Sequence, residues 1–399
     1  MHDLVVRGGR VVDPSQGIDR ELDVAIDGDQ VAAVGENLAA GGARQLLEAK
    51  GLIVTPGLID LHSHVYWGVA PLGIEPDPHC LRRGVTTAVD AGSSGASTFP
   101  GFRRYVIEVS ATRILAFLHI ATIGMAQDAG RPEEVAPELS DIRWARVDRA
   151  VEVARAHADL IVGIKVRLSE AMLGPGAEQC REALRRARQA AEAIGKPLMV
   201  HPGGTAISIE ELLGALAPGD VLTHCYHGRT DGVLDDQTGR VRECVREAVR
   251  RGIGLDVGHG AGSFSWDVAR RALEQDLQPS TISSDIHTWS VAHPAYDLAT
   301  TASKLLHLGI PLSEVIRKVT ERPAQAIAME STLGTLRPGA HADVTVMRLA
   351  EGEFPLTDAH GKTEHGRRRL EPVAVVRAGR VYECTPAVYQ VPRQHAHAG

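Results

Sequence analysis

The chain has 399 residues, 44% of them hydrophobic, which is enough for one large domain and a small one with a substantial apolar core. Its net charge of −7 and its scattered arginines argue against nucleic acid as a partner. Residues 1–5 contain no charged leader, no window is apolar over the ~18 residues of a membrane span, and the cysteines form no C-x-x-C pair. We therefore expect a cytoplasmic protein with reduced thiols and no membrane partner.

Short apolar runs separated by Gly and Asp occupy residues 1–50 and predict a small antiparallel β unit. This unit is too small to stand alone. Similar runs occur near the other end of the chain, at 342–347 and 372–381, and two half-sheets can complete one core. We therefore expect residues 1–54 and 334–399 to form one small β-sandwich domain.

Between these ends, apolar strand candidates alternate with helical stretches rich in Arg, Glu and Ala, and the helical period is clearest at 142–156, 178–194 and 241–251. The strand candidates are 58–62, 86–90, 114–118, 161–166, 198–201, 221–225, 253–257 and 281–285. Eight β/α units over roughly 270 residues predict an α/β fold of the (β/α)8 TIM-type barrel class, spanning residues 55–333. An open doubly wound sheet is the alternative.

His62 and His64 end the first strand candidate. Because side chains alternate between the two faces of a strand, both imidazoles point to the same side and can share a metal ion. The same spacing recurs at His395 and His397, but there it falls in a polar tail without periodicity. Only the first pair predicts a metal site.

Polar side chains also end other strand candidates, where a barrel places its catalytic groups. They are Lys165 in the fourth strand, His201 in the fifth, His224 in the sixth and Asp285 in the eighth. Each buried ionisable group carries a desolvation cost, and a shared metal centre compensates all of them. In the loops after strands six and seven, His227 and His259 are candidates for binding the substrate.

These residues resemble the metal ligands of the amidohydrolase superfamily, in which a His-x-His pair, a lysine, two further histidines and an aspartate hold two divalent metals. The segments 54–60, 320–324 and 334–344 also resemble that superfamily. Within it, the segments 76–79, 84–95 and 283–287 are similar to the metal-dependent deacetylases, which are often labelled dihydroorotase-like.

The resemblance implies a binuclear site in which His62, His64 and Asp285 bind one metal, His201 and His224 bind the other, and Lys165 bridges them. A protonated lysine repels cations and has no lone pair to donate, and the resemblance to the binuclear members implies that Lys165 is carboxylated. Imidazole-rich sites with a carboxylate suit zinc. The metals would activate a water molecule, and Asp285 would act as general base and then general acid.

We therefore expect a metal-dependent hydrolase that removes an acetyl or small acyl group from an amino or hydroxy carboxylic acid. The expected positive charge of the centre favours a carboxylate on the substrate. Opening of a cyclic amide, as in dihydroorotases and hydantoinases, is one alternative, and a non-catalytic barrel scaffold is another. His201-Pro202-Gly203-Gly204 lacks the His-x-x-Glu of adenosine-deaminase-like members, which disfavours deamination. A homo-oligomer is compatible with these expectations.

Overall fold

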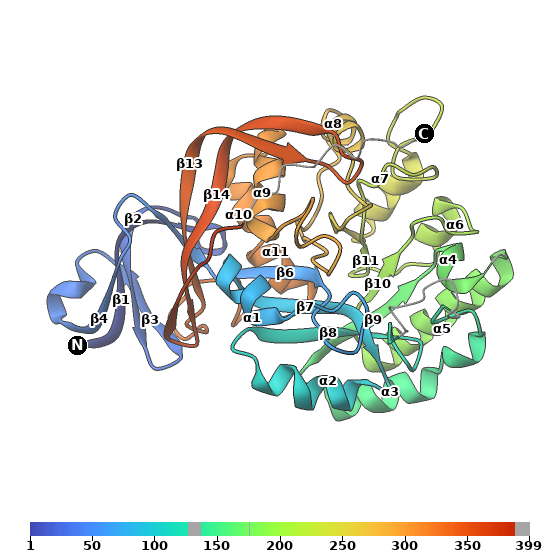
Figure 1. Cartoon of the computed structure of the whole chain (residues 1–399), viewed down its shortest axis with the longest axis horizontal. Helices are drawn as coiled ribbons and strands as arrows, with labels where there is room; N and C mark the ends of the chain where they lie inside the picture. The colour runs from blue at the N-terminus through green and yellow to red at the C-terminus, as the bar shows by residue number, and fades with distance from the viewer. Residues whose placement is uncertain (127–136, 175, 388–399) are drawn as a thin grey trace, which may run out of the picture.

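The computed structural model of the chain describes residues 1–126, 137–174 and 176–387, so His395 and His397 lie outside the described residues (Figure 1). Its larger part is built on a parallel sheet wrapped by helices. Within the described residues this sheet has seven strands in sequential order, with no reversal of the kind that a doubly wound sheet requires. The strands are β6 (Leu58–Ser63), β7 (Val85–Gly95), β8 (Arg113–His119), β9 (Ile161–Arg167), β10 (Leu198–His201), β11 (Val221–Leu222) and β12 (Gly254–Leu255).

Helices cover the outside of this sheet (Figure 1). The long helix α5 buries Cys180, Leu184, Ala187 and Ala191, which recur at helical spacing, and it ends at Gly195 in a left-handed conformation. The helices are α1 (Pro76–His79), α2 (Phe99–Tyr105), α3 (Val147–Ala156), α4 (Glu170–Leu173), α5 (Ala177–Ile194), α6 (Ile209–Gly214), α7 (Glu243–Arg250), α8 (Trp266–Leu273), α9 (Leu298–His307), α10 (Leu312–Lys318) and α11 (Glu321–Ala326). In the described parts of the chain, no helix combines the length and apolar character needed to cross a membrane.

The predicted eighth strand is not a regular strand. Instead, the segment 281–286 connects both edges of the sheet through isolated bridges, from Thr281 to Asp256 and from Ile286 to Ser63. The backbone of Asp285 has a φ of 47°, outside the β region, which ends any regular ladder at that residue. A curled sheet with an irregular closing segment therefore takes the place of eight regular strands.

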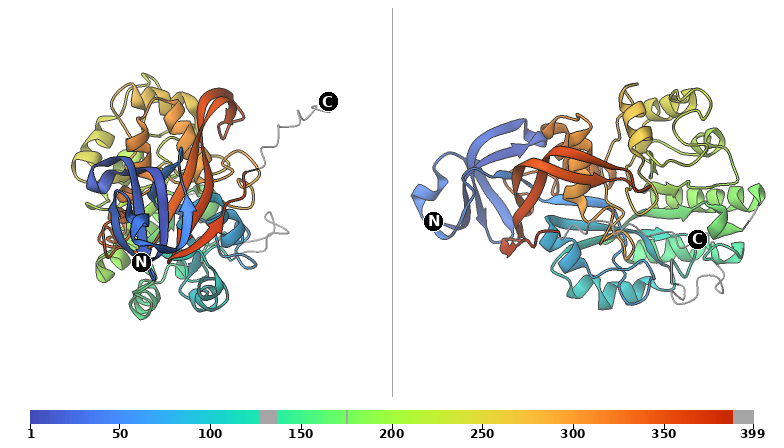
Figure 2. Two further views of the ribbon diagram at one scale, coloured as in Figure 1. Left: turned by 90° about the vertical axis from the view of Figure 1, so that its left-hand side faces the viewer. Right: turned by 45° about the horizontal axis from the view of Figure 1, so that its top comes forward.

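Both chain ends contribute to the second sheet, as the sequence predicts (Figure 2). It is a single mixed sheet and not two separate facing sheets, and its order is β15-β14-β13-β5-β1-β2-β3 with β4 beside β1. Strand β1 is antiparallel to β2 but parallel to β4 and β5, so the N-terminal unit is not purely antiparallel. Its strands are β1 (His2–Asp13), β2 (Ile18–Asp27), β3 (Gln30–Gly35), β4 (Ala43–Glu48), β5 (Ile53–Pro56), β13 (Val344–Thr357), β14 (Thr363–Arg377) and β15 (Arg380–Glu383).

The terminal sheet has its own apolar core, which includes Val6, Val54, Val344 and Val376. Strand β5 joins the two chain ends, because it pairs with β1 on one side and with β13 on the other. The domain boundaries at residues 54 and 334 stay a prediction.

The hairpin of β13 and β14 extends over the helices of the barrel (Figure 1). Near its turn, the amide of Ala359 donates to the carbonyl of Phe264 over 2.9 Å, and the Trp266 indole N–H donates to the Lys362 carbonyl over 3.0 Å. The hairpin thereby supports the loop that follows β12.

Candidate metal centre

Four imidazoles meet at one end of the parallel sheet, those of His62 and His64 at the end of β6, that of His201 at the end of β10 and that of His224 just after β11. The ring centroids of His62 and His64 are 5.4 Å apart, those of His62 and His224 are 4.9 Å apart, and those of His201 and His224 are 4.5 Å apart. Asp285 joins them from the closing segment. Its Oδ1 lies 3.3 Å from His62 Nε2 and 3.2 Å from His64 Nε2. Potential ligand atoms of His62, His224 and Asp285 all lie within 4.8 Å of one another.

Lys165 completes the set of six. It is fully buried on β9, and its Nζ lies 3.5 Å from His62 Nε2. Burial lowers the pKa of this amine to about 7, which increases the share of the neutral amine. Gly92 makes room for the lysine: its φ is 93°, and an added Cβ would lie 2.7 Å from Lys165 Cγ. All six residues line one cavity of about 340 Å³.

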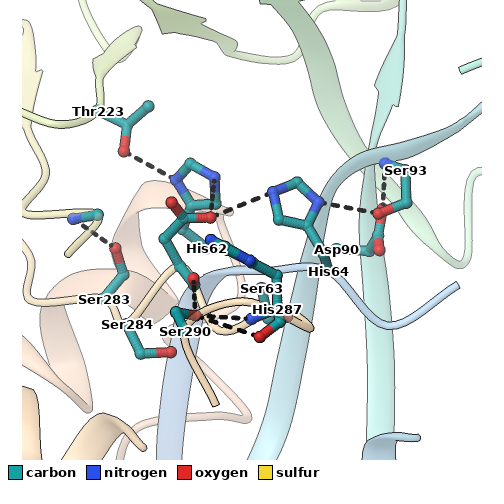
Figure 3. Close-up of polar contacts among 12 residues, drawn as sticks. His62, Ser63, His64, Asp90, Ser93, Thr223, Ser283, Ser284, His287 and Ser290 are labelled. Atoms are coloured by element: carbon teal, nitrogen blue, oxygen red, sulfur yellow. Dashed lines mark hydrogen bonds and ion pairs between the residues drawn. The ribbon is translucent and has the colours of Figure 1, made fainter. Parts of the chain in front are cut away.

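Three of the imidazoles, those of His62, His64 and His224, direct Nδ1 toward a hydrogen-bond partner in the surrounding protein. Nδ1 of His62 lies 2.8 Å from Thr223 Oγ1, and Nδ1 of His64 lies 2.9 Å from Ser93 Oγ (Figure 3). Nδ1 of His224 lies 2.7 Å from the carbonyl oxygen of Gly258. The Nε2 atoms of His62 and His64 are left to face the carboxylate of Asp285.

Burial decides the charge of these groups. It lowers the pKa of His64 to about 3, and it holds the pKa values of His62, His201 and His224 well below their usual value. The imidazoles are therefore neutral at pH 7, which is the form that binds metal. Burial also raises the pKa of Asp285 to about 6, a value suited to proton transfer near neutral pH.

The backbone is strained at two of these positions. His224 has a φ of 62° and Asp285 a φ of 47°, a region that costs a residue with a side chain on the order of 1–3 kcal/mol. Such strain persists where the surrounding structure enforces it, and it occurs disproportionately at functional sites. At both positions it aims a candidate ligand into the shared cavity.

Neutral imidazoles together with a carboxylate are the donor set that divalent metals such as zinc prefer. The group of His62, His224 and Asp285 already brings three such donors together. The chemistry of this site therefore fits a divalent metal ion.

The cavity wall also includes Arg167, which the sequence reasoning did not single out as a substrate ligand. Arg167 lines it and is held by Glu138, whose Oε1 accepts from the arginine Nε over 2.6 Å. Arg229, His287 and Trp289 also line the cavity. The signal for Arg167 was present: it lies two residues after Lys165 on one strand, so both side chains share a face.

The two predicted substrate ligands lie elsewhere. Neither His227 nor His259 is among the described residues that line the cavity. His227 Nδ1 accepts from the backbone amide of Arg229 over 3.2 Å. His259 is fully buried, stacks on Phe264 with centroids 4.7 Å apart, and contacts Lys304 Nζ at 2.7 Å. The structure thus gives both histidines local packing partners.

Comparison with known proteins agrees with this geometry. Residues 53–381 match the Amidohydrolase family. The chain belongs to the amidohydrolase family. It is therefore a hydrolase that acts on C–N bonds, as the sequence predicts.

Relatives of this amidohydrolase cover nearly its whole length. A deacetylase of Agrobacterium fabrum is 37% identical over 385 residues, which cover 94% of this chain and 90% of that protein. A crystal structure described as an adenine deaminase has a TM-score of 0.87 at 30% identity, covering 96% of this chain and 100% of that one. Another, described as a dihydroorotase, has a TM-score of 0.86 at 34% identity, covering 97% and 99%. The names of these relatives span several reactions, so the substrate must be argued from the site.

Proposed function

We propose that this amidohydrolase removes an acetyl or similarly small acyl group from the amino or hydroxy group of a carboxylic acid. The observation that carries the proposal is the convergence of six donor residues on one cavity. The deacetylase of Agrobacterium fabrum, similar over nearly the whole chain, supports the acyl group as the part removed.

The proposed centre holds two zinc ions. His62, His64 and Asp285 would hold one, His201 and His224 the other, and Lys165, carboxylated by carbon dioxide, would bridge them. When bound, the ions supply an activated water at neutral pH and polarise the acyl oxygen. The protein itself would contribute a side chain that transfers a proton during the reaction. Asp285, with its pKa raised to about 6, would take up the proton of the attacking water and deliver it to the leaving group.

A carboxylate on the substrate is supported by the arginines of the cavity wall. Arg167 lines the cavity beside Lys165, and Arg229 lines it from the loop after β11. A guanidinium can bind a carboxylate through two parallel hydrogen bonds, which fixes orientation as well as adding attraction. Arg167 is the better oriented of the two, because its contact with Glu138 holds it in place.

Opening of a cyclic amide is the second candidate. The structure described as a dihydroorotase favours it, with 34% identity and nearly complete coverage of both chains. Both reactions require the same centre and differ in the part of the cavity that surrounds the substrate.

The cytoplasm is the compartment that we propose. All five cysteines are free, and three of them, Cys80, Cys180 and Cys225, are buried. Free thiols are typical of a reducing compartment.

The test is a hydrolysis screen combined with metal analysis. N-acetyl amino acids and O-acetyl hydroxy acids, both enantiomers of each, are compared with hydantoins and dihydroorotate. We expect two zinc ions per chain and turnover of an acetylated acid. Turnover confined to the cyclic amides would replace the leading proposal by the second, and a purified protein that neither holds metal nor hydrolyses any compound would favour a non-catalytic scaffold.

A further inference from the structure

A histidine can ligate a metal through Nε2 only if its proton is on Nδ1. The Gly258 carbonyl, which can only accept, lies 2.7 Å from His224 Nδ1 and therefore fixes the proton there. The partner of His62 is different, because the hydroxyl of Thr223 at 2.8 Å can either donate or accept. Something else must decide the direction of that hydrogen bond.

Asp256 decides it. The Thr223 hydroxyl donates to Asp256 Oδ2 over 2.8 Å, and a hydroxyl has only one proton to give. With that proton used, Thr223 Oγ1 accepts from His62 Nδ1–H. The lone pair of His62 is thereby left on Nε2, which faces Asp285 and Lys165. Figure 3 shows Thr223 on the protein side of the His62 ring.

The environment of Asp256 indicates that orienting hydroxyls is its task. The carboxylate is fully buried and also accepts from the hydroxyls of Thr281 and Ser283, each over 2.6 Å. Asp60, another buried carboxylate, accepts one hydroxyl, that of Ser284, together with the backbone N–H groups of Ser284 and His62, and so also holds the chain itself. The Asp256 carboxylate thus accepts side-chain hydroxyls from two separate segments, that of Thr223 after β11 and those of Thr281 and Ser283 in the closing segment.

A similar hydrogen-bond arrangement contacts Nδ1 of His64, the second histidine of the His-x-His pair. Ser93 Oγ lies 2.9 Å from His64 Nδ1, and the buried Asp90 accepts from the Ser93 backbone N–H over 2.7 Å (Figure 3). A hydroxyl residue anchored by a buried carboxylate thus lies behind both imidazoles.

We propose that Asp256 is a positioning residue that acts through Thr223 to hold His62 as its Nδ1–H tautomer, ready to ligate metal through Nε2. This inference rests on the proposed function, because it assigns a purpose to a geometry that metal binding requires. It goes beyond the six expected ligands, because neither residue lines the cavity among the described residues.

Thr223 offers a matched pair of variants. Thr223→Val keeps the shape of the side chain and removes the hydroxyl, whereas Thr223→Ser keeps the hydroxyl and removes a methyl group. A role in hydrogen bonding predicts that Val is harmful and Ser is tolerated. A role in packing predicts the opposite order.

The primary measurement is zinc affinity, determined by competition with a chromophoric chelator, with zinc content after dialysis as a second readout. We expect Thr223→Val to weaken binding at one of two sites by about 10- to 100-fold, the usual effect of losing a partner behind a ligand. Thr223→Ser should stay close to wild type. Equal affinities for wild type and Thr223→Val would overturn the inference, and so would a larger loss in Thr223→Ser. A wild type that binds no zinc would instead refute the proposed function.

Asp256→Asn tests the upstream residue. An amide can donate to Thr223 Oγ1, which frees the hydroxyl proton to point at His62 Nδ1 and favours the wrong tautomer. We expect a zinc affinity as low as that of Thr223→Val, with little further loss in the double variant, because both changes remove one connected interaction. Fully additive losses would show that Asp256 does not act through Thr223. Thermal unfolding of the metal-free variants checks that each one folds.

Discussion

The arginine in the cavity wall provides the sharpest test of substrate charge. Removal of Arg167 alone would break a buried ion pair, since Glu138 is fully buried and its Oε1 lies 2.6 Å from the arginine Nε. That would destabilise the fold by about 3–5 kcal/mol. The informative variant therefore changes both residues, Arg167→Met together with Glu138→Gln, so that both charges of the buried ion pair are removed together.

A hydrogen bond to a charged group contributes about 1.5–3 kcal/mol, which corresponds to roughly 10- to 150-fold in kcat/KM. We expect the double variant to lose this factor on the best acetylated acid. Hydrolysis of the acyl group in the methyl ester of the same compound should change little, because the ester offers no anion to bind. The ratio of kcat/KM for acid and ester is the quantity to measure.

Glu138→Gln alone is the matched control. It keeps the guanidinium of Arg167 and a side-chain oxygen that can still accept from the arginine Nε, so it should keep the preference for the acid. An acid-to-ester ratio that survives in the double variant would refute the role of Arg167, and a wild type indifferent to esterification would refute the carboxylate itself.

Three further predictions follow from the site and the core. Lys165→Ala should fold normally but lose metal and activity together, with partial rescue by acetate, and wild-type turnover would contradict the bridging role. Asp285→Asn should keep much of its metal yet lose about 10²–10⁴ in kcat, whereas a change in KM alone would assign Asp285 to binding. Burial lowers the pKa of Lys304 from 10.5 to about 7, so the unfolded state binds more protons between these values. Stability should therefore rise with pH across that window, by at most ~1.4 kcal/mol per pH unit, and urea unfolding of Lys304→Met should show a weaker rise.

The candidate ligands were predictable because strand periodicity determines where their side chains point. His62 and His64 share a face by alternation alone, and a barrel gathers strand ends such as those at His201 and Asp285. The irregular eighth segment was not predictable, because it begins with Thr281 and Ile282, two β-branched residues that fit a strand. What interrupts it is the positive φ of Asp285 and the hydrogen bond from the Ser284 backbone to Asp60, a residue 224 positions away.

The loop histidines show a second limit of sequence reasoning. His259 lies next to the predicted strand seven, but stacking on Phe264 turns its ring toward Lys304 and away from the cavity. The orientation of a loop side chain depends on packing partners that no local period encodes. The pairing of Thr223 with Asp256 was hidden for the same reason, since the two residues meet only across neighbouring strands.

The irregular segment that closes the parallel sheet also carries one of the candidate metal ligands, Asp285. Residues 281–286 hold the sheet edges together through isolated bridges and a few long-range contacts, and Asp285 sits within them across from His62. In the proposed holoenzyme a metal shared by these two residues would hold the closing segment against β6. Amide hydrogens such as that of Asp285, which bonds to the His62 carbonyl over 2.8 Å, would then exchange slowly with deuterium in the loaded protein and faster after chelation. Metal binding and the ordering of residues 281–286 between the two edges of the sheet would then be coupled in one local equilibrium.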